Sequence, residues 1–505
     1  MARDAIAVTK TPGFWSNKHQ NINQPIELLY DVWNPPPPVT NLVKDLNLTI
    51  AKIHSLIEQA QKDKKRLRAV GGGWSLSSAA AADGRLINTK PLNWYFPLSA
   101  KSVSEKYDGD RTNLLYVQCG VSINELNSHL AARGKSLSTS GASNGQTIVG
   151  AMSTGTHGSA FDVGSIQDCV VGLHIITNAK KSIWLERKSY PVVSDDFLSK
   201  FECKIIRDDA VFNSAIVSFG SFGFIHAVMI EAEPIYLLEA FRQKLPMNNN
   251  LKKNMDTLDF SLLPLPSPAN KPYHFEVVLN PHNINDGAYV TTIYKRPYST
   301  NYTPPGGISG GLGPGDDLLC FVGSLTDGVP GIIGTLVNQL ASSLYTDTFH
   351  EWGTLGEIFS ATNAFGKASS TEIGIDHKQT SKAFDIIMDA HNAAGPFAGF
   401  ISFRYVKKSK ATLAFTKFPV TCTIEFPGAY SARSRKFYEE VWTKLEAAGI
   451  PYTLHWGQEN NFTPARVKKI YGTAVDEWIE SRKKILDENG RNVFNNDFLV
   501  SCGLT

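Results

Sequence analysis

The sequence predicts an α+β protein of two domains, and three observations lead to this prediction. Over about the first 235 residues, strands and helices are interrupted by glycine- and serine-rich segments, which is typical of one α+β domain. From residue 236 onward, candidate strands at 397–406 and 420–426 alternate with candidate helices at 382–394 and 432–448. This alternation predicts an antiparallel sheet that helices cover on one side. The length of 505 residues provides enough chain for both cores.

Composition and charge exclude several classes of protein. Apolar residues make up 42% of the chain and charged residues 19%, which excludes a disordered tail, a collagen-like repeat or a coiled-coil rod. A net charge of +3 gives no electrostatic footprint for nucleic acid. The N-terminus lacks the apolar core of a signal peptide, and no run of 18 apolar residues exists, so we expect a cytoplasmic protein without a membrane span. The six cysteines form no Cys-x-x-Cys pair and are expected to be reduced and mostly buried.

The strongest helical signal of the first domain lies at residues 41–64. Leu46, Ile50, Ile53 and Ile57 repeat at alternating four- and three-residue spacing, which makes one apolar stripe. A short apolar strand, 67–70, follows. We expect a second helix at 122–133 and a strand at 170–177.

In the second domain the sequence predicts strands at 273–279 and 289–294. Residues 303–317 hold nine glycines and prolines and must form a loop. The apolar segment 331–344 is too short to cross a membrane and is expected to be a buried helix.

A glycine-rich turn directly follows the strand 67–70. Its residues are Gly71, Gly72, Gly73, Trp74 and Ser75. Three glycines allow a sharp turn and a close approach of backbone N–H groups to an anion, although a plain tight turn has the same composition. The spacing is not that of a Rossmann dinucleotide fingerprint.

A second glycine-rich segment covers residues 141–159. It holds five glycines and six serines or threonines with a single histidine, so it has almost nothing to bury and many groups that donate hydrogen bonds. A loop of this length in a compact domain points to a ligand that orders it. The segment also contains Gly141-Ala-Ser143-Asn-Gly145, the spacing of a hydrolase nucleophile elbow. An elbow needs a strand before it and a helix directly after it; because residues 137–140 are a poor strand and 150–158 are not expected to be helical, the hydrolase hypothesis is the weaker one.

Candidate chemistry in the second domain lies on two neighbouring strands and one turn. Alternation places Ser402 and Arg404 on one face of their strand, and Thr421, Thr423 and Glu425 on one face of the next. These residues line a cavity or form a cross-strand pair at the surface of the sheet. His455-Trp456-Gly457-Gln458 either lines a polar pocket or ends a strand with Trp456 in the core. The twelve histidines show no spacing typical of metal ligands, so no metal site is predicted.

Taken in order, these motifs resemble the FAD-binding flavoproteins of the vanillyl-alcohol oxidase type. The resemblance is carried by Gly-Gly-Gly-Trp-Ser75, by Thr154-Gly-Thr-His-Gly-Ser159, by the segment ending Phe-Gly-Phe-Ile225 and by His455-Trp-Gly. The last motif and the ending Val493-Phe-Asn-Asn496 are most similar to the sugar-1,4-lactone and alditol oxidase branch.

The resemblance implies a PCMH-type FAD-binding domain at residues 1–235, to which residues 455–505 return, and a substrate domain at 236–454. It implies an oxidoreductase that transfers a hydride from the CH–OH group of a small organic substrate to flavin N5, with oxygen or another acceptor reoxidising the flavin. It also implies the residues that bind FAD: Gly71, Gly72, Gly73, Trp74, Ser75, Gly141, Asn144, Gly145, Thr147, Gly150, Ser153, Thr154, Thr156, His157, Gly158, Ser159, Gly223, Ile225 and Asn496.

This sequence departs from the family pattern at three positions. Trp74 stands where many relatives have a histidine bonded covalently to the flavin, so noncovalent FAD is expected. Ser402 replaces the glutamate of a Glu-x-Arg motif, and Gln458 replaces a lysine. Arg404 remains to stabilise the reduced flavin, and the base is Glu425, His455 or a residue that the motifs do not place. The changes leave two alternatives open: a bulky, sterol-like substrate, and a flavin-binding protein without turnover.

Overall fold

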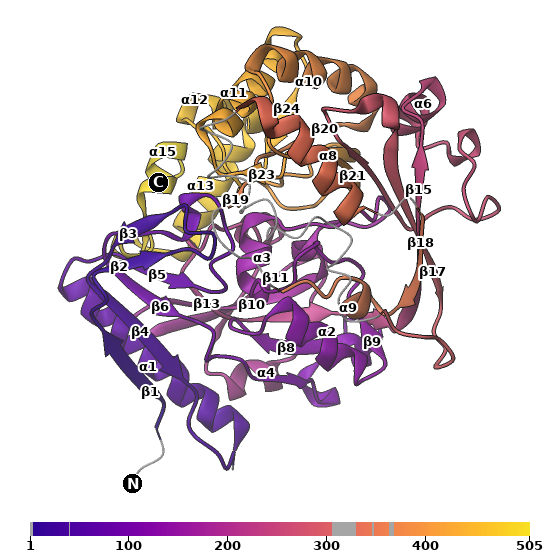
Figure 1. The fold of residues 1–505 in the computed structure, drawn as a ribbon. Helices are drawn as coiled ribbons and strands as arrows, with labels where there is room; N and C mark the ends of the chain where they lie inside the picture. The colour runs from indigo at the N-terminus through magenta and orange to yellow at the C-terminus, as the bar shows by residue number, and fades with distance from the viewer. Residues whose placement is uncertain (1–3, 40, 306–329, 346–347, 363–367) are drawn as a thin grey trace.

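A computed structural model describes residues 4–39, 41–305, 330–345, 348–362 and 368–505. Most of the predicted loop 303–317 and Cys320 lie outside these residues; the five other cysteines are buried as free thiols. The α+β class is confirmed (Figure 1). No helix within the described ranges is long and apolar enough to span a bilayer.

The N-terminal half is built on two sheets. The four-stranded sheet has the order β1 (Ile6–Lys10), β4 (Leu28–Trp33), β6 (Arg85–Asn88) and β5 (Leu67–Val70). The six-stranded sheet has the order β12 (Lys204–Arg207), β11 (Lys181–Glu186), β10 (Val170–Asn178), β13 (Phe224–Glu231), β8 (Leu114–Gln118) and β7 (Tyr95–Pro97). Smaller pairs are β2 (Phe14–Ser16) with β3 (Asn23–Pro25), and β9 (Lys135–Ser136) with β14 (Glu233–Pro234).

The helices of this half begin where the sequence provides caps. In α1 (Leu42–Lys62), Asn41 caps the first turn and the predicted apolar stripe is buried. In α2 (Ile123–Ala131), Ser122 and Glu125 form a capping box. Two further helices of this half are α4 (Asp195–Lys200) and α5 (Asp209–Ala215).

One expectation about the second glycine-rich segment is wrong. Residues 150–158 were expected not to be helical, but α3 (Ile148–Thr154) forms within the segment and ends at Gly155, whose φ of +81° is left-handed. Ile148, Ala151 and Met152 are fully buried and provide the apolar contacts that the glycine and serine content obscured. The hydrolase geometry is still absent, since Ser143 makes only an isolated bridge to Ala361 and follows no strand.

The second half contains an eight-stranded antiparallel sheet. Its order is β18 (Thr348–Gly353), β15 (Tyr236–Leu245), β17 (Ala288–Pro297), β16 (His274–Leu279), β21 (Ile401–Lys407), β22 (Val420–Glu425), β20 (Glu372–Asp376) and β24 (Tyr452–Leu454). A two-stranded pair, β19 (Ala368–Ser369) and β23 (Gly428–Ala429), flanks it.

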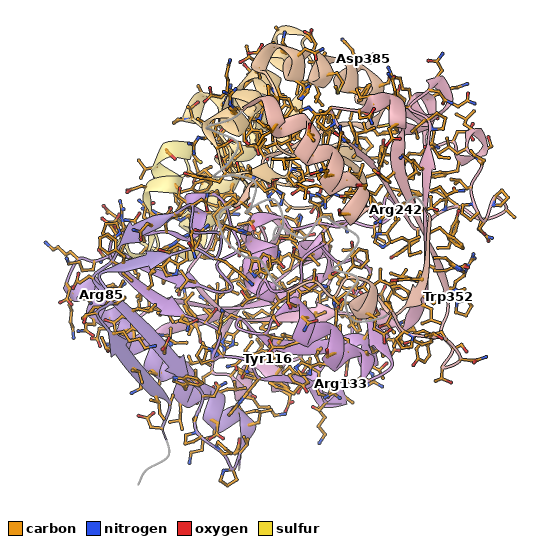
Figure 2. All side chains as sticks on the ribbon, viewed as in Figure 1. Arg85, Tyr116, Arg133, Arg242, Trp352 and Asp385 are labelled. Carbon is orange, nitrogen blue, oxygen red and sulfur yellow. The ribbon has the colours of Figure 1, made fainter. Side chains whose placement is uncertain are left out.

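Helices α10 (Thr380–Ala394) and α11 (Ala432–Ala447) pack together and cover the face of this sheet that carries Phe403 (Figure 1). Alternation therefore turns Ser402 and Arg404 to the opposite face. Helix α8 (Ile333–Leu344) is amphipathic rather than wholly buried: Ile333, Val337 and Ala341 are buried, while Gly331 and Ile332 before it are exposed. Arg242 of β15 lies beside the end of α8, with its guanidinium 5.0 Å from the centroid of the Tyr345 ring (Figure 2). Short helices α6 (Asn249–Thr257) and α9 (Leu355–Ile358) complete this half.

The chain ends in four helices, of which the last three lie against the N-terminal half (Figure 1). They are α12 (Pro464–Tyr471), α13 (Ala474–Ile485), α14 (Glu488–Val493) and α15 (Asp497–Cys502). Trp478 of α13 is fully buried and donates to the carbonyl of Val217 at 2.9 Å, and α14 contacts α1.

Candidate functional site

Two cavities meet between the halves of the molecule. The first, here called the loop cavity, has about 870 Å³ of empty space, including the part open to solvent. The second, here called the sheet cavity, has about 1120 Å³ on the same measure. Trp74, Ser75, Gln146 and Thr154 line both, so the two form one elongated space.

The loop cavity is formed by the two glycine-rich segments. A Cβ atom on Gly71 would lie 2.1 Å from Thr147 Oγ1, and one on Gly72 would lie 2.7 Å from the carbonyl oxygen of Gly145. Both distances are far below van der Waals contact, so only glycine allows the two segments to approach this closely. The Gly223 backbone, with φ of +111°, also lines this cavity, together with Ile225.

Trp74 lies at the junction of the two cavities. Its indole packs against the backbone of Gly145, which has no room for a Cβ there. The Lys18 ammonium lies 4.1 Å from the ring centroid, and the buried ring of His19 packs edge-on at 5.7 Å. Burial and the Lys18 charge lower the pKa of His19 to about 4, so this ring is neutral at pH 7.

The sheet cavity lies on the face of the large sheet that carries Arg404. Strand register places Ser402 opposite Glu425, and Glu425 opposite Glu372. In the neighbouring row, Arg404 lies opposite Glu276 of β16. Four strands therefore bring three glutamates around one arginine.

These side chains form one hydrogen-bonded cluster. Arg404 Nη2 donates to Glu372 Oε1 at 3.0 Å and also to Glu425 Oε2. His157 Nε2 lies 3.1 Å from the other oxygen of Glu372. Gln458 donates to Glu425 Oε1 at 2.7 Å. The surface cross-strand pair considered from sequence is thus a pair, but it lies in the wall of a cavity, where Arg404 is only 8% exposed.

A second contact on this face joins Ser402 to Glu276. Ser402 Oγ donates to Glu276 Oε1 at 3.1 Å. Glu276 lines the cavity and keeps partial exposure there.

Burial and the charges within the cluster shift the pKa values of its members. Burial opposes ionisation of Glu372, but the charges of His157 and Arg404 hold its pKa well below the usual range. Burial also opposes the charge of Arg404, yet Glu425, Glu372 and Glu276 raise its pKa above the usual range. For Glu276 burial prevails over Arg404 and Arg242, and its pKa is raised. Burial lowers the pKa of His455 to about 4, so it is neutral at pH 7.

His157, Glu372 and His455 place ligand-type atoms within 4.8 Å of one another, a grouping that histidine spacing did not predict. Both oxygens of Glu372 already accept hydrogen bonds or pair, one with His157 and the other with Arg404. A guanidinium beside the carboxylate also repels a cation. We therefore interpret the group as part of the hydrogen-bonded cluster.

The structure distributes the residues expected to bind FAD over both cavities. The loop cavity is lined by Gly71, Gly72, Gly73, Trp74, Ser75, Thr147, Gly150, Ser153, Thr154, Gly223 and Ile225. The sheet cavity takes Gly141, Thr156 and His157 together with all five candidate catalytic residues, Ser402, Arg404, Glu425, His455 and Gln458. Gly158 and Ser159 line a small third cavity that shares Glu276 and Arg404 with the sheet cavity.

Three of the expected residues instead hold backbone in place. Asn144 accepts from Ser140 Oγ and donates to the carbonyl of Phe359. Asn496 caps α15 and donates to the carbonyls of Ala79 and Ala81 at 2.9 Å each. The backbone of Gly145 packs against the Trp74 indole, and its carbonyl oxygen lies close to Gly72.

Sequence reasoning missed several cavity residues. Glu276 lies on a strand that was predicted, and its face follows from alternation, but nothing in the sequence shows which strand pairs with the one carrying Arg404. Glu372 lies on a strand that was not predicted, and Tyr345 lies just after the predicted helix 331–344, so the sequence placed neither beside Arg404. Gln146, whose buried Oε1 lacks a partner among the described residues, lies within the segment 141–159 but was not among the residues expected to bind FAD.

Comparison with known proteins agrees with this geometry. Residues 48–185 match the family described as FAD binding domain. An L-gulono-1,4-lactone dehydrogenase of Mycobacterium tuberculosis is 24% identical over 433 residues, which cover 83% of this chain and 87% of the relative. A D-arabinono-1,4-lactone oxidase of Debaryomyces hansenii is 27% identical over 213 residues, 42% of this chain and 35% of the relative.

Residues 48–185 form an FAD-binding domain. The predicted resemblance to flavoproteins of the vanillyl-alcohol oxidase type is confirmed. A solved structure of cholesterol oxidase from B. sterolicum superposes with a TM-score of 0.70 at 12% identity, covering 99% of this chain and 97% of the other. At this identity the likeness shows the fold, a PCMH-type domain with a large antiparallel sheet, and it confirms the predicted architecture.

The cavities suit FAD in shape and in chemistry. Glycines at the meeting of the two segments leave backbone room that a Cβ would fill, as a diphosphate requires. The partnerless Gln146 Oε1 offers a buried acceptor where the two cavities join. The elongated space has one half formed by loops and another rich in charge, which matches a dinucleotide with a reactive ring at one end.

Proposed function

We propose that this protein is an FAD-dependent oxidoreductase that oxidises the CH–OH group of a small organic substrate. The observation that carries the proposal is the junction at Trp74, where a glycine cradle opens directly into a cavity that contains a buried arginine and three glutamates. The lactone dehydrogenase and oxidase relatives support the same reaction class.

In this proposal the adenosine diphosphate half of FAD lies in the loop cavity and its ring system extends past Trp74 into the sheet cavity. The attachment is noncovalent, since an indole offers no nucleophile at position 74. When bound, FAD supplies the hydride acceptor. Residues 1–235 with the return of 455–505 serve the cofactor, and 236–454 serve the substrate.

Arg404 provides fixed positive charge beside the reacting ring. Glu372 and Glu425 both accept hydrogen bonds from its Nη2, so the guanidinium is already held in place before the reaction. Preorganised charge of this kind stabilises a negative charge that develops in the transition state. His157 and Gln458 fix the two glutamates in turn.

The substrate hydroxyl must also lose a proton. His455 is a weak base because burial lowers its pKa to about 4, and Glu425 already accepts from Arg404, Ser370 and Gln458. Glu276 borders the cavity and has a raised pKa, and among the described residues it accepts a side-chain hydrogen bond from Ser402 alone. We therefore propose Glu276 as the acceptor of the hydroxyl proton. It lies within hydrogen-bond distance of Ser402, the residue that stands where the family motif has a glutamate.

The wall of the sheet cavity favours two substrate classes. Ser370, Ser402 and the glutamates suit a polyol or sugar lactone, whose hydroxyls they can bind. Val278, Tyr345 and Phe400 form an apolar side that suits a bulkier alcohol, the second candidate.

The test is anaerobic mixing of the FAD-loaded protein with sugar lactones, alditols and sterols while flavin absorbance is followed. Bleaching by at least one alcohol, reversed when oxygen or an artificial acceptor is added, supports the proposal. Unchanged absorbance with every alcohol, in protein that retains its flavin, would identify a flavin-binding protein without turnover.

A further inference from the structure

A buried cation without a carboxylate partner lies in the wall of the loop cavity. Arg68, on β5, is 1% exposed and lines this cavity together with Gly71 and Gly220. Among the residues that the structure describes, no Asp or Glu forms an ion pair with Arg68. Its Nε also has no hydrogen-bond partner there.

Three backbone carbonyls fix the Arg68 guanidinium. Nη1 donates to the carbonyl of Phe494 at 2.8 Å, and Nη2 donates to those of Ala79, at 2.7 Å, and Phe219. These bonds neutralise no charge. Burial, with the charges of Arg482 and Arg66, lowers the pKa of Arg68 to about 9. A buried charge in this state is costly until an anion approaches it.

Arg482 provides an internal comparison. It is 2% exposed, forms no ion pair with any residue that the structure describes, and donates to the carbonyls of Ser221 and Arg491 at 3.0 and 2.9 Å. It therefore holds the same 219–221 segment as Arg68 does. Unlike Arg68, it is not among the residues that line the loop cavity.

We propose that Arg68 is the electrostatic anchor of the adenosine diphosphate half of FAD, with the ligand diphosphate as the countercharge that the protein lacks. This inference rests on the proposed cofactor. The glycine cradle provides N–H donors and space, and Arg68 provides the full positive charge that the cradle itself lacks.

The experiment measures binding to protein from which flavin has been removed. FAD, ADP and uncharged adenosine are titrated against wild type, R68M, R68K and R482M at two salt concentrations. R68M keeps the length of the side chain without its charge, and R68K keeps the charge without the planar fork. R482M removes the other arginine that holds the same segment.

We expect R68M to weaken FAD and ADP binding by about tenfold to a hundredfold, and adenosine binding by less than twofold. R68K should retain a clear part of the affinity, R482M should stay within about twofold of wild type, and the salt dependence of ADP binding should be smaller in R68M. If R68M fails to fold, the proposal is tested by comparing the FAD and ADP affinities of R68K and R482M and by the salt dependence of ADP binding to the wild type.

Equal losses in R68M and R482M, or in R68M and R68K, would overturn the proposal in favour of a purely structural role. Those results would leave FAD binding by the wild type intact. A wild-type protein that binds neither FAD nor ADP would overturn the proposed cofactor, and this inference with it.

Discussion

Substitution of Gly72 by alanine tests the glycine cradle directly. The new Cβ would lie 2.7 Å from the carbonyl oxygen of Gly145 and 2.8 Å from Trp74 Cδ1. Ordinary van der Waals contact begins near 3.4 Å, so the Gly145 backbone must retreat by about 0.7 Å. Overpacking of this kind costs about 1–3 kcal/mol. If the loops separate to relieve it, the dissociation constant for FAD rises by about fivefold to 150-fold.

The assay is fluorescence titration of flavin-free protein with FAD, with circular dichroism to confirm folding. Gly331→Ala is the matched control, because Gly331 is exposed and a Cβ there has nothing within 4 Å. This control should bind FAD as the wild type does. Wild-type affinity in folded G72A would refute the assignment of this cradle to the cofactor.

Two double variants distinguish steric overlap from a general loss of FAD binding when alanine replaces a glycine of the cradle. At Gly71 the obstacle is Thr147 Oγ1, at 2.1 Å, which is a side-chain atom that mutation can remove. G71A/T147A should therefore bind FAD more tightly than G71A, whereas adding T147A to G72A should give no recovery. Recovery in neither or in both pairs would contradict the stated contacts.

Two further predictions concern the charged cluster. E276Q should slow flavin reduction by an alcohol by about a hundredfold and should abolish the acidic limb of the pH profile of kcat/KM. That limb should lie above the usual glutamate range in the wild type, because a base with a raised pKa gains activity as pH rises through it; an unchanged limb in E276Q would exclude Glu276 as proton acceptor. Glu372 has a lowered folded-state pKa, so its contribution to stability should be complete above its unfolded pKa of about 4.3 and should be lost as pH falls towards the folded value. The difference in unfolding free energy between wild type and E372Q, measured by urea titration, should accordingly shrink between about pH 5 and pH 3, and a constant difference would contradict the assignment.

Local features of the fold were predictable because their signals are local. The apolar stripe predicted α1 to within two residues at each end, and alternation correctly placed Ser402 and Arg404 on the same face. Helix α3 was missed because glycine and serine content outweighed three buried apolar residues, whose partners come from elsewhere in the chain.

The candidate site was predictable only in part, since its composition depends on strand order. Which strand lies beside β21 decides that Glu276 faces Arg404, and no residue of either strand encodes that neighbour. The same limit applies to Glu372, which reaches the cluster through the pairing of β20 with β22. The glycine-rich segments were recognisable because close backbone approach demands glycine in the sequence itself.

The central claim is that the two joined cavities hold FAD without a covalent bond. The most direct measurement is the visible absorption spectrum of the purified protein, followed by acid precipitation and spectra of the supernatant and the pellet. The account predicts flavin bands in the native protein that move entirely into the supernatant. Colour retained in the pellet would contradict noncovalent attachment at a site where position 74 is tryptophan, and absence of flavin bands even after FAD is added would contradict the cofactor itself.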